Sequence, residues 1–252
     1  MARRIGLLTL EEDLSPGYWL NASLRPWGSG IAPVVTSGVP DGYEAYGRLF
    51  HPAYRYQPDN TRKPVRWAEV ASANGRVTHP AMEWASMTGS LEYLQNANQP
   101  GIWDQRPERG SLPLPEAARL ADILGQHTAT PERCWFAVWE GFAALALPRD
   151  ETVPMLPIPQ RNMLLLSGPL SGITTSMCED GWDQRASLWW PDDRAWCVAT
   201  DVDLMATYIG GNRACITELI HDRELEVLEV GPDQRVDWES DTINPLPPRQ
   251  AG

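Results

Sequence analysis

Short runs of β-branched and aromatic residues, separated by glycine and proline, recur along most of the 252-residue chain. Such runs are typical of strands, because branched side chains pack well on a pleated surface and glycine and proline favour turns. We expect strands at residues 5–10, 31–36, 43–50, 135–139, 162–167, 196–204 and 225–230. Because strands follow one another without strictly alternating helices, the sequence favours an α+β fold with a mainly antiparallel sheet.

Two segments have the periodicity of amphipathic helices. Residues 115–126 begin with a proline, carry a glutamate in the first turn and repeat apolar residues on one face. In residues 212–221, Asn212 can cap the first turn. A third helix is expected at residues 65–73, so the sheet has two or three flanking helices.

Length and composition indicate one compact unit, expected over residues 1–243. A chain with 42% hydrophobic and 21% charged residues can bury a large core. Prolines mark a possible boundary between halves within residues 148–160, and residues 244–252 are expected to be a disordered tail.

The cysteines and the apolar stretches indicate a cytoplasmic protein. The four cysteines are widely spaced and form no C-x-x-C pair, which fits reduced thiols. The apolar stretches are shorter than the roughly 20 residues that a membrane span needs, so no membrane partner is expected. Residues 1–10 imitate the basic and apolar parts of a signal peptide, but acids at positions 11–13 end the apolar stretch early, so residues 5–10 are interpreted as a first strand.

The charge of the chain limits its partners. Lysine and arginine number 21 and aspartate and glutamate 33, which gives a net charge of −12. This charge opposes the phosphate neutralisation that supplies most nucleic-acid affinity, so no nucleic-acid partner is expected. An acidic protein instead attracts basic partners over long range.

Tryptophan is abundant, with 12 residues in the chain. Four of them lie in or beside long segments for which we expect irregular structure: Trp103, Trp182, Trp189 and Trp190. Exposed aromatic residues often anchor interfaces. We therefore expect a Trp-rich loop surface that binds a basic protein partner or a small-molecule ligand. The alternative is that these indoles only fix their own loops to the body of the protein.

Two carboxylates follow the apolar stretch at residues 195–200. If Asp201 and Asp203 lie on a strand, their side chains point to the same face. Paired carboxylates suit Mg²⁺ or Mn²⁺, which prefer oxygen ligands. This predicts, as the second candidate function, a metal-assisted transferase or hydrolase, although no cofactor is firmly implied. The other interpretation is a pair of solvated acids, or acids paired with Arg194 or Arg213.

A glycine pair precedes the second helix. Backbone N–H groups of Gly210 and Gly211, followed by Arg213, can hold an anion at a helix N-terminus. The pattern lacks the lysine and hydroxyl residue of a phosphate-binding loop, so a plain glycine turn is the alternative.

The four residues Trp-Asp-Gln-Arg occur twice, at 103–106 and 182–185. Each copy is followed by Ser-Leu and later by an apolar run that ends near an acid. This order is typical of an internal repeat, and the sequence leaves open whether the chain consists of two related halves.

Residues 188–200, with the glycine pair at 210–211, and residues 134–141 resemble a family of uncharacterised, acidic, Trp-rich cytosolic proteins from high-GC bacteria. The likeness covers most of the chain from Tyr43 onward. It implies one cytosolic unit, and it brings no activity, cofactor or catalytic residue with it.

Overall fold

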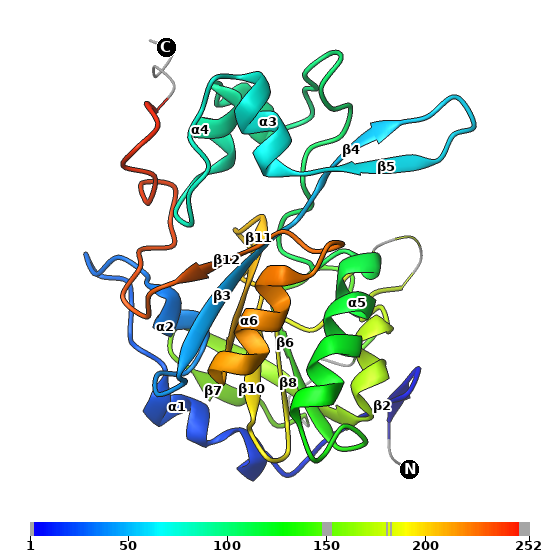
Figure 1. Cartoon of the computed structure of the whole chain (residues 1–252). Helices are drawn as coiled ribbons and strands as arrows, with labels where there is room; N and C mark the ends of the chain where they lie inside the picture. The colour runs from blue at the N-terminus through cyan, green and yellow to red at the C-terminus, as the bar shows by residue number, and fades with distance from the viewer. Residues whose placement is uncertain (1–2, 148–152, 180, 182, 247–252) are drawn as a thin grey trace.

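A computed structural model describes residues 3–147, 153–179, 181 and 183–246 of the chain (Figure 1). Its main element is a ten-stranded sheet in the order β1-β2-β8-β6-β9-β10-β11-β3-β12, with β7 paired to β8. Every pairing among these strands is antiparallel. The strands are β1 (Arg4–Ile5), β2 (Leu8–Leu10), β3 (Ala45–Phe50), β6 (Cys134–Trp139), β7 (Leu156–Ile158), β8 (Arg161–Gly168), β9 (Leu188–Pro191), β10 (Trp196–Ala199), β11 (Ala206–Gly211) and β12 (Val227–Val230). The predicted α+β class with a mainly antiparallel sheet is confirmed.

Two cores cover the two faces of this sheet. On one face, α5 (Leu114–Leu124) and α6 (Arg213–His221) pack against residues such as Phe136 of β6 (Figure 1). On the other face, α1 (Trp19–Ser23) and α2 (Val35–Gly38) pack against residues such as Trp135, the neighbour of Phe136 in β6. This alternation follows from the twofold side-chain period of a strand.

A smaller unit lies beyond one end of the sheet. It contains the hairpin of β4 (Ala53–Tyr56) and β5 (Arg62–Val65), followed by α3 (Trp67–Ala73) and α4 (Trp84–Thr88) (Figure 1). Its own core is built around Trp67, Trp84 and Trp103. Four short 3-10 helices complete the described elements: η1 (Ser15–Gly17), η2 (Glu92–Leu94), η3 (Gly125–His127) and η4 (Leu170–Thr174).

The helix predictions at residues 115–126 and 212–221 are confirmed by α5 with η3 and by α6. Asn212 caps α6 as expected, because its Oδ1 accepts a hydrogen bond from the N–H of Cys215 at 2.8 Å. The strand expected at residues 31–36 is wrong. There the N–H of Val34 donates to the Ser37 hydroxyl at 3.2 Å, and this local bond starts the short helix α2.

The segment after β12, residues 231–246, is called the C-terminal strap below. The tail expected from residue 244 does not begin there, because Asn244 is buried and hydrogen-bonded to Val77. Residues 247–252 and part of the expected boundary, residues 148–152, lie outside the described residues. Strands from both sides of that boundary share the one sheet.

The strands β6 and β10, which follow the two Trp-Asp-Gln-Arg copies, flank β9 on its two sides. A true internal repeat stays a prediction. Within the described residues, no helix is long and apolar enough to cross a membrane.

Candidate functional site

Two adjoining cavities lie between the β10–β11 turn and the C-terminal strap. Their volumes are about 470 and 430 Å³, and Asp203, Leu204 and Trp238 line both. The larger one, which also contacts Trp67 and Trp84 of the small unit, is called the apolar chamber. The smaller one, which faces α2 and the sheet, is called the acidic chamber. The two chambers share these three residues as a common wall, and the pair of chambers is called the groove below.

The turn at the centre of the groove explains where the paired acids lie. Strand β10 ends at Ala199, so the expectation that Asp201 and Asp203 share a strand face is wrong. The Asp201 carboxylate instead accepts the N–H of Asp203 at 2.9 Å, and the Asp201 carbonyl accepts the N–H of Leu204 at 3.1 Å. Short polar side chains favour such turns because they can accept backbone N–H groups two residues on.

Asp201 already has a cationic partner. Its Oδ2 lies 2.8 Å from Nη2 of Arg161, whose side chain is 12% exposed. Across the described parts of the chain, no three or more His, Cys, Asp or Glu side chains are grouped so that they could hold a metal ion. The strand-face argument for a Mg²⁺ or Mn²⁺ site at Asp201 and Asp203 therefore no longer applies.

The acidic chamber combines carboxylates with aromatic rings. Its acids are Asp201, Asp203 and Asp237, its aromatic residues are Trp27, Tyr208 and Trp238, and none of the described residues that line it is basic. Asp237 lies 2.6 Å from the Arg235 guanidinium. The Asp203 carboxylate is exposed and has no hydrogen-bond or ion-pair partner among the described residues. Asp203 is therefore the acid most available to a ligand.

Tyr208 on β11 forms part of the chamber floor. It is 4% exposed, and its hydroxyl is buried without a hydrogen-bond partner among the described residues. Burial raises the pKa of this phenol well above its usual value of 10. Tyr208 therefore stays neutral and adds an aromatic surface without adding charge.

The apolar chamber has a different character. Trp67 and Trp84 form its inner wall, with ring centroids 5.1 Å apart, and Met205 lies beside them. Three large apolar side chains on its lining are exposed: Leu91 by 39%, Leu246 by 44% and Trp238 by 53%. Large apolar side chains exposed together around a cavity are typical of an interaction site.

The C-terminal strap forms one wall of both chambers, and the first half of it is bound to the segment before α2. The N–H of Val35 donates to the carbonyl of Gln234 at 2.9 Å, and the N–H of Val236 donates to the carbonyl of Pro33 at 3.1 Å. These backbone bonds fix the position of Asp237 and Trp238, which follow directly.

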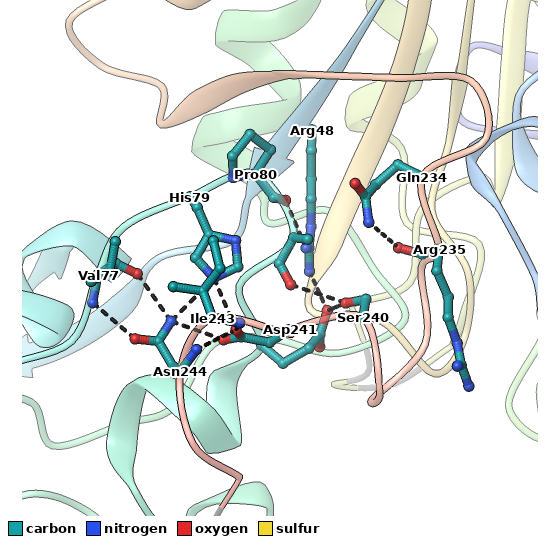
Figure 2. Close-up of polar contacts among 12 residues, drawn as sticks. Arg48, Val77, His79, Pro80, Gln234, Arg235, Ser240, Asp241, Ile243 and Asn244 are labelled. Carbon is teal, nitrogen blue, oxygen red and sulfur yellow. Dashed lines mark hydrogen bonds and ion pairs between the residues drawn. The ribbon is translucent and has the colours of Figure 1, made fainter.

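The second half of the strap is held by a buried polar network (Figure 2). Asp241 Oδ1 lies 2.9 Å from Nε2 of His79, and Asn244 bonds both of these side chains. The Ser240 hydroxyl bonds Oε1 of Glu83 at 2.9 Å, and the same oxygen accepts from Arg48 at 2.8 Å. Because buried polar groups are costly unless they are paired, this network favours one position of the strap.

Of the four tryptophans singled out from the sequence, the three that the structure describes are buried and form no binding surface. Trp103 and Trp189 are 0% exposed and Trp190 is 1% exposed. The expected irregular segment contains β9, a central strand between β6 and β10, and its side chains alternate between the two cores: Trp189 lies in the core on one face of the sheet and Trp190 in the core on the other. Trp103 packs against Trp84 in the small unit. Trp182 lies outside the described residues.

The glycine pair and its arginine also lie away from the groove. Gly210 and Gly211 are inside β11, and a Cβ at Gly210 would meet Val39 at 2.7 Å, so the expected turn is wrong and close packing explains this glycine. The Glu44 carboxylate accepts the N–H of Arg213 at 3.0 Å and occupies the N-terminus of α6.

Neither predicted arginine pairs with the aspartates of the groove. The Arg213 guanidinium lies 2.7 Å from a carboxylate oxygen of Glu229. Arg194 has a left-handed backbone, with φ 55°, and its guanidinium lies over the ring of Trp19 at 4.8 Å.

Of the predicted site residues that the structure describes, only Asp201 and Asp203 line the groove. The sequence analysis missed Trp27, Tyr208, Asp237 and Trp238. Two of them, Asp237 and Trp238, could have been noticed in the sequence, because Trp238 stands between two acids in Asp237-Trp238-Glu239.

Comparison of the chain with family models, with curated proteins and with solved structures gives no match.

Proposed function

We propose that this chain is a binding protein, and that its acidic chamber receives an arginine or lysine side chain of a basic protein partner. The observation that carries this proposal is the Asp203 carboxylate, which is exposed, has no partner among the described residues and lies in a chamber with three aromatic side chains. The other two acids of the lining, Asp201 and Asp237, already pair with Arg161 and Arg235. A cation gains from a carboxylate through a charge-assisted hydrogen bond and from an aromatic face through cation–π attraction.

The size of the chamber supports this assignment. Ligand sites are usually clefts of about 300–1,000 Å³, and the acidic chamber has about 430 Å³. Valine side chains at positions 34, 35 and 236 line it beside the aromatic residues. The apolar stem of a lysine or arginine can pack against such a wall while its charged end reaches the acids.

Two features favour a protein partner over a small organic cation. The exposed apolar side chains around the apolar chamber offer additional contact area that a small ion would not use. The net charge of −12 increases the rate of encounter with a basic protein and makes that rate sensitive to salt.

The cysteines support a reducing compartment for this protein. Cys134, Cys178, Cys197 and Cys215 form no disulfide, and three of them are buried. Disulfides are rare in the cytosol and common outside it. We therefore include a cytoplasmic location in the proposal.

The test compares two glycine-flanked peptides that differ only in one side chain, arginine or its neutral analogue citrulline. Binding is measured by NMR titration of the full chain at low and high salt. We expect the arginine peptide to shift the indole N–H signal of Trp238 and the citrulline peptide to bind at least about 10-fold more weakly, because a hydrogen bond between charged groups contributes about 1.5–3 kcal/mol. Added salt should weaken binding of the arginine peptide.

Asp203→Asn removes the available carboxylate and should weaken binding of the arginine peptide by about 10-fold. The matched control is Asp122→Asn, because Asp122 is exposed on α5, lines neither chamber and gives the same change in net charge. Equal binding of the two peptides, or equal effects of the two variants, would contradict the proposal. Tight binding of free arginine alone would point to a small-molecule ligand instead.

A further inference from the structure

We infer that the apolar chamber receives a large apolar side chain from the same segment of the partner, so that the groove recognises a basic and an apolar residue together. This inference rests on the proposed function of the acidic chamber. It adds a second contact, and it requires the partner to carry a large apolar residue close in sequence to its basic residue.

The two chambers are neighbours, since Asp203, Leu204 and Trp238 line both of them. A single extended segment can therefore place one side chain in each. In an extended chain, residues two apart point to the same side and lie about 6.5–7 Å apart. Neighbouring pockets that share a wall are suited to side chains separated by few residues.

The charges around the apolar chamber explain why it should not take a second cation. Glu83 is bonded to Arg48 and to Ser240. Glu239 lies 2.6 Å from the Arg235 guanidinium. Arg109, a basic residue, also lines this chamber. Only Asp203 is left without a partner among the described acids of this chamber, and it is shared with the acidic chamber.

The walls of the apolar chamber suit an apolar side chain. Trp67 and Trp84 are at most 2% exposed and form a fixed inner wall, whereas Leu91 and Leu246 are 39% and 44% exposed around it. An incoming leucine or phenylalanine would remove part of this exposed apolar area from water, and such burial is the main source of affinity in most interfaces.

The experiment extends the peptide titration. One peptide carries arginine alone, and three others also carry leucine one, two or three residues after the arginine. We expect at least one spacing to bind about 10-fold more tightly than arginine alone, which is the gain expected from burying most of a leucine side chain. A peptide with lysine in place of that leucine should lose the gain.

The variant Leu246→Ala should reduce the gain from leucine, measured as the ratio of the affinities of the leucine-containing and arginine-only peptides for the same variant. Leu114→Ala is the matched control, because Leu114 has the same 44% exposure and lines neither chamber. Both variants alter an exposed side chain, so both should fold.

The possible failures are distinguishable. If the arginine peptide binds and leucine adds nothing at any spacing, or if lysine gives the same gain as leucine, this inference is wrong and the proposed function stands. If no arginine-containing peptide binds, the proposed function is wrong and this inference fails with it.

Discussion

Glu83 at the apolar chamber and Glu116 in the first turn of α5 are both withdrawn from water, but their surroundings differ. Burial raises the pKa of both carboxyl groups. At Glu83, Arg48 and the Ser240 hydroxyl oppose this effect through hydrogen bonds. At Glu116, Oε2 has no hydrogen-bond partner among the described residues, and the pKa rises to about 7. At the groove, the buried Glu83 carboxylate is hydrogen-bonded to Arg48 and to Ser240 of the strap. At α5, Oε2 of the buried Glu116 carboxyl group has no such partner among the described residues.

The largest expected effect is that of Arg48→Met. Arg48 is 2% exposed, and its removal leaves the Glu83 carboxylate without its cation. Removing one partner of a buried ion pair typically costs about 3–5 kcal/mol. Urea denaturation should show this loss in the free energy of unfolding. Arg213→Met is the control, because its pair with Glu229 is exposed and should contribute at most about 1 kcal/mol. Equal losses of unfolding free energy in the two variants would show that the buried Arg48–Glu83 pair stabilises the protein no more than the exposed Arg213–Glu229 pair.

The second expected effect is a gain in stability. Glu116→Gln removes a carboxyl group whose pKa is about 7 in the folded state and near 4.5 when unfolded. The folded state therefore retains the proton between these values, and the stability of the natural protein decreases as pH rises from 4.5 to 7. At pH 8 the variant should be more stable by ~3 kcal/mol, and near pH 4 the difference should vanish. The free energy of unfolding measured from pH 4 to 8 tests this.

Glu132→Gln, at an exposed position outside α5, is the control for that pH series. The charged groups near Glu116 that act on its pKa are Glu108, Arg62 and Arg185. A Glu116→Gln variant that is less stable than the natural protein at pH 8 would show that this carboxylate has a compensating partner, like Glu83.

The smallest effect on stability is expected for Trp238→Ala. Its side chain is 53% exposed, so the free energy of unfolding should change by less than about 1 kcal/mol. Binding of the arginine peptide should nevertheless fall, because the indole lines both chambers. If Trp238→Ala instead lowers the free energy of unfolding strongly and leaves binding of the arginine peptide unchanged, Trp238 stabilises the fold and takes no part in binding.

Local signals in the sequence identified much of the fold. The caps and periodicity of α5 and α6 depend on residues a few positions apart, so they can be read without knowing the fold. The strand expected at residues 196–204 is correct only to Ala199, because the acids after it fold back on their own backbone. Strand β9 was missed, because its Leu-Trp-Trp-Pro sequence is short and contains a proline.

The site was harder to predict, because its parts come from distant segments. Trp27, Asp203, Tyr208 and Trp238 meet only through the order of the sheet strands and the path of the strap. Which indoles are exposed also depends on long-range packing. Trp189 is sealed in the core that α5 and α6 form on one face of the sheet, and no property of the indole itself distinguishes it from Trp238.

The C-terminal strap also sets the order in which the groove can be made during synthesis. Residues 231–246 follow β12, the last strand of the sheet, so the ribosome adds them after the whole sheet has been translated. A nascent chain that ends at residue 231 contains every described strand and helix but lacks Asp237 and Trp238. Recognition of a partner through the groove would therefore begin only once translation has passed the strap, and deletion of the strap would abolish recognition without removing any described strand.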